Sequence, residues 1–348
     1  MSEARHDRGA GAPPEPMRAR TRPAEGRDGS GLRSARGFAW WHDGRALVSE
    51  GVARCVPVAS VVDALAAIEV EEGPAVPATG PIAHGALPFD PAAMAAAEMI
   101  IPRRLWTRDA DGSTWLTEIS GGPGPSRPAP ADPPVVDRGP DGSGVSVRQW
   151  EGLVGEALRR IDAGQLDKVV VARQVTMTAD RPISPGQVVR RLLAAQPGCY
   201  VFAADGFVGA TPEMLVERHG EVVRSRPMAG TVGQSDERAL SWLSRSGKNR
   251  WEHELVVDAV VRCLTRWCAE RPVASEPHTE PFADLAHIVT EVTGTLSAPF
   301  PSALDLALEL HPTPAVAGAP TEAALALIST LEPAPRGRYG GPVGWVDA

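Results

Sequence analysis

Short runs of alternating apolar and polar positions between residues 37 and 120 predict β-strands separated by turns. One run at 46–48 leads into another at 52–56, and a helical patch follows at 61–68. Residues 1–36 differ, because they hold eight Arg and five acidic residues and almost nothing that could enter a core. We therefore predict a disordered Arg-rich leader over 1–36 and the start of ordered structure at residue 37, beside an aromatic cluster.

Glycine and proline are concentrated at 121–145, where they make up thirteen of twenty-five residues. This composition predicts an exposed loop or hinge that separates the strands of 37–120 from a second part, 146–348. The second part opens on Ser146 and Gln149, which are spaced as in a helical capping box. The apolar spacing after them predicts a helix that ends at Gly164, and an apolar strand follows at 167–173.

The remainder of the second part mixes helices and strands. A helix is predicted over 185–195, then a meander of four strands between 200 and 225. A long helix is predicted from about residue 236 past 267, with a break near Gly247, and residues 287–294 are predicted to form one strand. This order indicates one large α+β fold with layered α/β/α architecture.

Composition and charge restrict the partners and the compartment. The formal net charge is −8 at pH 7, which argues against nucleic acid as a main partner. No apolar run is long enough to span a membrane, and the first residues lack the apolar core of a signal peptide. The four cysteines show neither a CxxC pair nor a metal spacing with His, so a reducing cytoplasmic location is expected.

Two isolated charged residues lie at the boundaries of apolar runs. Lys168 opens the Val-rich run at 167–173, and Glu213 follows Pro212 after the apolar run that ends at 211. A buried Lys and a buried Glu that face one pocket would form a base and acid pair. Alone, each is more often a solvated edge or turn residue, about 85% of the time for a Lys that opens such a strand. The interpretation depends on the further motifs that follow.

Glu252 lies on the predicted long helix, three and seven residues before Leu255 and Ala259, so it faces inward. An inward carboxylate needs a partner, because burying it unpaired is costly. Mg²⁺ would suit it, since Mg²⁺ prefers oxygen ligands and often uses only one or two carboxylates. A salt bridge to a nearby Arg or Lys is the alternative.

Two further stretches could line a small-molecule site. His287 opens the predicted strand 287–294, although a lone His of this kind is more often structural than catalytic. Residues 310–320 contain two prolines around Thr313 and small residues after it. Such a rigid loop allows a ligand to approach the backbone closely.

Taken together and in order, these motifs resemble the chorismate-utilising enzymes, and most closely the isochorismate synthases. The resemblance covers about residues 147–348. The motifs that carry it are Asp167–Arg173, Gly209–Glu213, Met228–Thr231, Ser246–Lys248 with Glu252-His253, His287, Leu310–Ala315 and Tyr339–Trp345. It implies the layered fold of anthranilate synthase component I and a chorismate substrate.

The resemblance also implies roles, position by position. Lys168 matches the general base that activates water for attack at C2 of chorismate, and Glu213 matches the general acid that protonates the departing C4 hydroxyl. Glu252 matches one ligand of a catalytic Mg²⁺. The positions that line the substrate pocket are matched by Gly230, Thr231, His287 and Ala315.

Within the family, Lys168 favours water as the nucleophile, because the ammonia-using anthranilate branch commonly lacks a Lys there. Ala229 stands where aminodeoxychorismate synthases often carry a nucleophilic Lys, and Asn249 stands where salicylate synthases carry a Glu. Residues 287–294 look somewhat more like the anthranilate branch. The isochorismate synthases fit best, with a salicylate- or anthranilate-type enzyme as the alternative.

The sequence ends at Ala348, where members of the family continue with further strands and a helix that supply other Mg²⁺ and carboxylate ligands. Two expectations follow. The first is a monomeric, Mg²⁺-dependent isochorismate synthase that serves siderophore, menaquinone or salicylate-type metabolism. The second is a C-terminally shortened, inactive relative that only binds.

Overall fold

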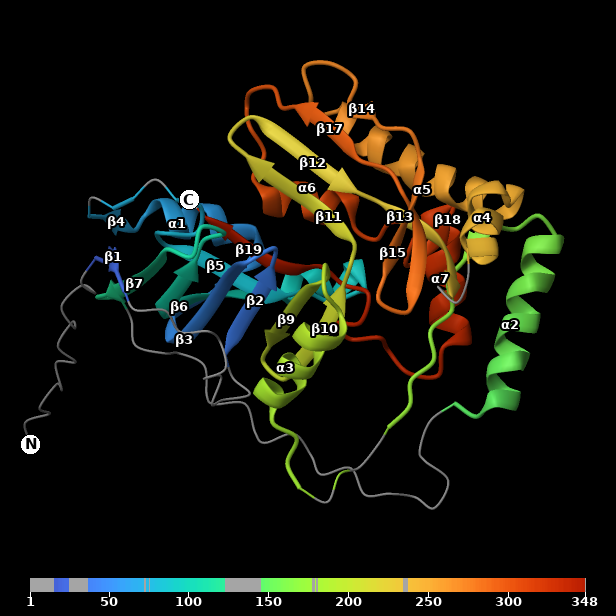
Figure 1. Ribbon diagram of the computed structural model, residues 1–348, viewed down its shortest axis with the longest axis horizontal. Coiled ribbons are helices and arrows are strands. Elements are labelled where there is room, and N and C mark those ends of the chain that lie inside the picture. Colours follow the sequence, from blue (N-terminus) through green and yellow to red (C-terminus); the bar gives the residue numbers. More distant parts are fainter. Residues whose placement is uncertain are drawn as a thin grey trace, which may run out of the picture.

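The computed structural model describes residues 16–24, 37–71, 73–74, 76–122, 145–176, 179, 181–233 and 237–347. Within these ranges the strands form four sheets, and helices cover them (Figure 1). The Gly/Pro-rich loop predicted at 121–145 lies almost entirely outside the described residues. No helix among the described residues is long and apolar enough to cross a membrane.

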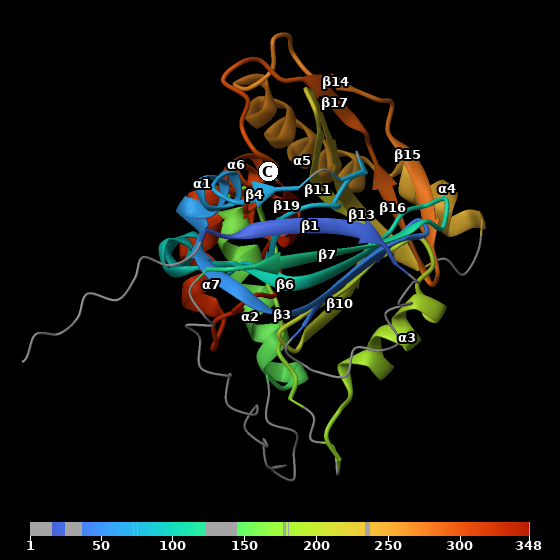
Figure 2. The ribbon, with the colours of Figure 1, turned by 90° about the vertical axis from the view of Figure 1, so that its left-hand side faces the viewer.

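The largest sheet has ten strands and draws on both parts of the chain. Its main path runs β10-β9-β2-β3-β6-β7-β1-β4, while β5 pairs with β6 and β19 pairs with β5 (Figure 1). Figure 2 shows β1, β7, β6 and β3 side by side in this sheet. Its strands are β1 (Arg18–Pro23), β2 (Phe38–His42), β3 (Arg45–Pro57), β4 (Glu69–Val70), β5 (Ile82–Ala86), β6 (Glu98–Arg108), β7 (Thr114–Ser120), β9 (Tyr200–Ala204), β10 (Phe207–Thr211) and β19 (Val343–Asp347). The strands predicted for 37–120 are confirmed, except that the runs at 46–48 and 52–56 form one strand, β3, with a shift of register after Val52. Three strands from the second part complete their sheet.

The disordered leader predicted for 1–36 is wrong for residues 18–23, which form β1. This strand pairs antiparallel with β7 over its whole length. Ala19 is fully buried, while Arg18 and Arg22 point outward to Glu69 and Glu118. The prediction counted charges and missed that exposed arginines alternate with less exposed residues along this strand, so that the arginines occupy its solvent face.

Helices and helical turns cover the large sheet in two places. A core that includes Val61, Leu65 and Ile101 joins α1 (Val61–Ala66) and the 3-10 turn η1 (Val58–Ser60) to the strands, and Met94 of the 3-10 turn η2 (Pro91–Ala96) packs against it. The predicted helix at 185–195 is confirmed as α3 (Pro185–Ala195), which packs on β9 and β10. Its Val189 is almost fully buried.

The predicted four-stranded meander is divided between sheets. Its first two strands, β9 and β10, extend the large sheet, while β11 (Met214–His219) and β12 (Val222–Arg226) form a second sheet with β17 (Val292–Thr295) and β14 (Val273–Ala274). A third sheet contains β13 (Met228–Gly233), β16 (Leu285–Val289) and β15 (His278–Phe282).

The strand predicted over 287–294 is likewise two strands, β16 and β17, because they pair with different partners on either side of Pro227. β12 pairs with β17 and β13 pairs with β16, while Pro227 separates β12 from β13. The N–H of Thr290 donates to the Pro227 carbonyl at 3.4 Å. Both paths of the chain thus leave one sheet and enter the next at the same point.

Helices of the second part cover these two smaller sheets. The predicted break near Gly247 is confirmed: α4 (Glu237–Arg245) ends, and Ser246 caps α5 (Gly247–Thr265) by accepting a hydrogen bond from the Asn249 N–H. α5 packs across β13, β16 and β17, and α6 (Ala303–Leu310) packs on β11 and α5 (Figure 1). The capping box of Ser146 and Gln149 is also confirmed, at the start of α2 (Val147–Asp162).

The strand predicted at 167–173 is wrong in length, because regular pairing is limited to β8 (Lys168–Val169). It pairs with β18 (Gly318–Ala319), and flanking hydrogen bonds at 2.8 Å join Asp167 N to Ala319 O and Val170 N to Ala317 O. α7 (Thr321–Leu331) follows β18 directly. Beyond residue 170 the backbone bonds to side chains instead of a strand, as described below.

Close approach of β18 to Lys168 requires a glycine, which gives a first prediction. Gly318 has φ +150°, and a Cβ there would overlap the carbonyl oxygen of Lys168 and lie 2.8 Å from the Ala324 Cβ. We expect Gly318→Ala to lower the free energy of unfolding by about 3 kcal/mol or more, measured by urea denaturation.

The control for this substitution is Gly152→Ala. Gly152 lies in α2, and a Cβ there would meet nothing within 4 Å. A helical Gly→Ala change at such a position should stabilise by about 0.5–1 kcal/mol. Equal effects of the two substitutions would contradict the close contact between β18 and Lys168.

Candidate active site

Three of the predicted residues come together from separate elements. Lys168 opens β8, Glu213 lies in the turn between β10 and β11, and Glu252 lies on α5. The carboxylates of Glu252 and Glu213 both interact electrostatically with the Lys168 ammonium. The base, acid and metal-ligand candidates therefore share one site, although 84 residues separate Lys168 from Glu252 (252 − 168).

Burial brings Lys168 and Glu213 closer to exchanging protons near neutral pH. Loss of solvation lowers the pKa of Lys168, and the nearby carboxylates of Glu252 and Glu213 oppose that shift. Loss of solvation also raises the pKa of Glu213 to about 7, against the opposing effects of the Met228 N–H and of Lys168. A neutral amine and a neutral carboxyl are the forms that a base and an acid need.

The Glu213 turn is held locally. The Glu213 N–H donates to the Thr211 hydroxyl at 3.2 Å. Thr211 ends β10, where it pairs with Tyr200 of β9. The proposed acid is therefore attached to the edge of the ten-stranded sheet, whereas the proposed base belongs to the small sheet of β8 and β18.

Gly230, Thr231 and His287 form one cluster on β13 and β16. His287 Nδ1 lies 3.0 Å from the Thr231 hydroxyl and 3.3 Å from the Gly230 carbonyl oxygen. Burial lowers the pKa of His287, so the imidazole is neutral at neutral pH, while its bond to Gly230 opposes the shift. A neutral ring can donate one hydrogen bond and accept another, which suits a wall that recognises polar ligand groups.

Gly230 also sets the distance between β13 and the helices. It has φ +74°, and a Cβ at this position would lie 3.1 Å from the Asn249 Cβ and 3.4 Å from Leu243 Cδ1. Only glycine accommodates both this backbone conformation and the close packing of α4 and α5. The predicted substrate-binding glycine is therefore also required by packing.

Ala315 lies in the loop between α6 and β18, beside the Lys168 strand. The peptide bond between His311 and Pro312 is cis, and His311 Nε2 bonds to the Phe89 carbonyl at 2.8 Å. The N–H groups of Val316 and Ala317 donate to the Thr313 carbonyl at 3.2 and 3.0 Å. These hydrogen bonds hold the loop backbone in place, as expected from its two prolines.

Glu252 is partly buried, and its side chain is 23% exposed. Lys248, one helical turn earlier and 81% exposed, lies 3.7 Å away, so the ion pair considered as the alternative to a metal is present. Such a pair contributes little, because Lys248 is solvated. No group of three His, Cys, Asp or Glu residues in the described ranges could hold a metal. Among the described residues, Glu252 would therefore supply one hard oxygen donor to a Mg²⁺ ion.

His253 is a buried residue to which sequence reasoning gave no role of its own. Its Nε2 lies 2.7 Å from the Thr290 hydroxyl, and burial lowers its pKa to about 4. The neutral imidazole ties α5 to the end of β16, next to Glu252. Its position beside an inward-facing Glu was the available signal.

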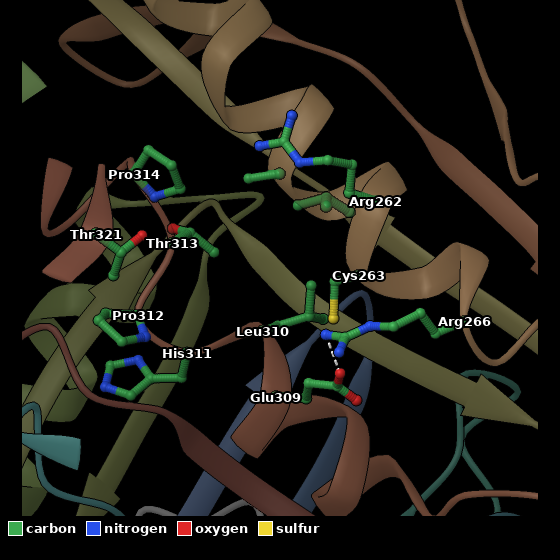
Figure 3. Close-up of a pocket in the computed structure, with 12 residues that line it drawn as sticks. Arg262, Cys263, Arg266, Glu309, Leu310, His311, Pro312, Thr313, Pro314 and Thr321 are labelled. Carbon is green, nitrogen blue, oxygen red and sulfur yellow. Dashed lines mark ion pairs between the residues drawn. The ribbon is translucent and has the colours of Figure 1, made fainter. Parts of the chain in front are cut away.

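A cavity of about 510 Å³ lies between α5, the end of α6 and the start of the loop that carries Ala315 (Figure 3). Arg266, at the end of α5, forms an ion pair with Glu309 of α6 beside the Cys263 thiol, and Thr313 and Thr321 lie across the cavity. None of the seven predicted site residues belongs to its lining. The cavity is therefore lined by the start of the loop, at residues 311–314, and not by the candidate site residues.

Comparison with known proteins identifies the family of the chain. The family profile described as "Chorismate binding enzyme" matches residues 128–348. The chain is 37% identical to a Mycobacterium tuberculosis protein named "Putative isochorismate synthase MenF". The alignment spans 289 residues and covers 77% of this chain and 72% of the relative. It is also 37% identical over 210 residues to isochorismate synthase DhbC of Bacillus subtilis, covering 56% of this chain and 53% of the relative.

The fold agrees with that of a solved structure. MenF, the menaquinone-specific isochorismate synthase from Escherichia coli, superposes with a TM-score of 0.77 at 22% identity, covering 97% of this chain and 84% of that chain. The predicted layered α+β fold is thereby confirmed.

Proposed function

Because the chain belongs to the chorismate binding enzyme family, we propose that it is an isochorismate synthase, which adds water at C2 of chorismate and removes the C4 hydroxyl. The observation that carries this proposal is the shared site of Lys168 and Glu213, in which burial lowers the pKa of the amine and raises that of the carboxyl. The names of the relatives support the same activity.

In the proposed reaction, Lys168 assists the attack of water at C2 and Glu213 assists the departure of the C4 hydroxyl. Lys168 takes a proton from water as its oxygen bonds to C2, and the ring double bond shifts. Glu213 gives its proton to the C4 oxygen, which leaves as water. Each turnover therefore moves one proton onto the amine and one off the carboxyl, and exchange with solvent restores both.

Pocket residues would orient the ring. The cluster of Thr231 and His287 offers a hydroxyl and an imidazole, and the fixed backbone at Ala315 offers a wall of small side chains. Glu252 would hold Mg²⁺, which supplies positive charge opposite a substrate carboxylate when bound. In this protein of net charge −8, a dianionic substrate needs such a local cation.

The test is an assay of the purified protein with chorismate and Mg²⁺ in H₂¹⁸O, with products separated by chromatography and weighed by mass spectrometry. We expect isochorismate that carries one ¹⁸O. An aminated product formed only with ammonia, or salicylate with pyruvate, would assign the chain to another branch. Binding without turnover would overturn the activity.

The proposed metal ligand gives a further prediction. We expect Glu252→Gln to raise the Mg²⁺ concentration for half-maximal activity by at least tenfold, because the amide lacks the charge that a divalent cation prefers. The matched control is Glu254→Gln on the exposed side of the same helix, where the Mg²⁺ dependence should stay unchanged. The measurement is a Mg²⁺ titration of the initial rate. An unchanged dependence in Glu252→Gln would remove this residue from the metal site.

We further propose a cytoplasmic enzyme that acts as a monomer, whose product enters siderophore, menaquinone or salicylate-type synthesis. The relatives include an isochorismate synthase DhbC and proteins named MenF, and these names support the class of pathway without selecting one.

A further inference from the structure

One ion pair in the second part is almost completely removed from solvent. Arg336 and Glu332 have side-chain exposures of 4% and 6%. The Arg336 Nε lies 2.8 Å from Glu332 Oε2 and one of its terminal nitrogens lies 2.5 Å from Oε1, so the contact is bidentate. The other ion pairs described above have at least one exposed partner.

Both members of the pair bind backbone groups of the segment that follows Lys168, the proposed base. Arg336 donates to the Val170 carbonyl at 2.6 Å, and Glu332 accepts from the Ala172 N–H at 2.7 Å. These contacts begin two residues after Lys168, where pairing with β18 ends. The ion pair therefore replaces the sheet partner that this backbone lacks.

Arg336 also binds the backbone of the Ala315 loop. It donates to the Val316 carbonyl at 2.8 Å, one residue after Ala315, and its guanidinium lies 4.2 Å from the centre of the Phe89 ring. Phe89 in turn accepts a hydrogen bond from His311 through its carbonyl. A single guanidinium thus links the Lys168 strand, the Ala315 loop and the Phe89 turn.

We propose that Glu332 and Arg336 are positioning residues, which fix the Lys168 strand against the Ala315 loop so that the amine stays in its desolvated place in the site. This inference rests on the proposed function for the role of Lys168. Because β8 has only two paired residues, its direction depends on what holds residues 170–172. The planar guanidinium of Arg336 makes four hydrogen bonds, two to Glu332 and one each to the carbonyls of Val170 and Val316, which is more than the three donors of an ammonium allow.

The two lysines of this chain allow the inference to be tested without relying on turnover. Lys168 and Lys248 are its only lysines; Lys168 is partly buried in the site, and the side chain of Lys248 is 81% exposed. The pH at which acetic anhydride half-modifies each lysine can be followed by mass spectrometry of its peptide. Lys248 serves as the internal reference in every sample.

The variants are Glu332→Gln, the milder Glu332→Asp, and Arg336→Lys. We expect the modification midpoint of Lys168 to rise by about one pH unit or more in Glu332→Gln and Arg336→Lys, because a loosened strand readmits water to the amine. Lys248 should not shift. In the assay with chorismate, kcat should fall at least tenfold while KM changes less than threefold.

The matched control is Arg103→Lys in the ten-stranded sheet. Arg103 is half-buried on β6 and donates to the carbonyls of Ile119 and Gly121 at 3.2 and 3.0 Å, in a different sheet from Lys168. It should leave the Lys168 midpoint and kcat unchanged. An unshifted Lys168 midpoint in the folded variants, Glu332→Asp included, would overturn the inference, as would an equal shift in Arg103→Lys. A wild-type protein inactive on chorismate would overturn the proposed function, while the modification experiment would still decide the positioning.

Discussion

Replacing Lys168 by Ala is expected to lower the rate of isochorismate formation by about 10²–10⁴-fold, the usual contribution of a positioned general base. The loss should appear in kcat, because water would still reach C2 but nothing would accept its proton. The amine contributes through its depressed pKa, which comes from burial and persists although Glu252 and Glu213 oppose it. Steady-state rates, with urea denaturation to confirm folding, measure the effect.

Lys248→Ala is the control for this substitution. Lys248 is exposed and pairs with Glu252 at 3.7 Å, so its removal should change kcat by less than about threefold. Near wild-type turnover in Lys168→Ala would remove Lys168 from the chemistry. Exogenous primary amines that restore turnover to Lys168→Ala, and not to the wild type, would support its role.

Glu213→Gln is expected to abolish turnover and at the same time to stabilise the fold at alkaline pH. The amide cannot protonate the departing C4 oxygen, so kcat should again fall by about 10²–10⁴-fold. For stability, the pKa of Glu213 rises from 4.5 to about 7 on folding because of lost solvation. Ionisation of this carboxyl therefore costs the native state more than it costs the unfolded chain.

The sign of the pH dependence follows from that raised pKa. The protonated carboxyl contributes stability that is fully present below pH 4.5 and is lost as the pH rises to about 7. We expect Glu213→Gln to match the wild type at pH 4 and to exceed it by about 1–3 kcal/mol at pH 8. Urea denaturation at the two pH values measures the difference, with Glu254→Gln on the exposed side of α5 as the control.

Local signals predicted the local structure. The capping box at Ser146, the helix at 185–195 and the break before Gly247 were all readable, because each depends on residues within a few positions of one another. Sheet membership was not readable. Which strands pair is decided between residues far apart, so β9 and β10 joined the large sheet while β11 and β12 joined another.

The same limit applies to the site. Lys168, Glu213 and Glu252 attracted attention as isolated charges in apolar surroundings, and their roles came from the resemblance. The pair of Glu332 and Arg336 was missed, because an acid and a base four residues apart are typical of an exposed helical surface. What makes this pair different is its contact with residues 170 and 172, which lie on a distant segment.

The pairing of β19 with β5 has a consequence for how the protein is made. The β5 strand, residues 82–86, can pair with β19 only after residues 343–347 have been synthesised. The strands β9 and β10 are also synthesised after the first strands of their sheet. During synthesis on the ribosome, the first strands of the large sheet must therefore persist with unpaired backbone groups. Such long-range pairing slows folding and leaves nascent chains prone to aggregation. Soluble yield in a heterologous host should accordingly respond strongly to temperature and chaperone supply.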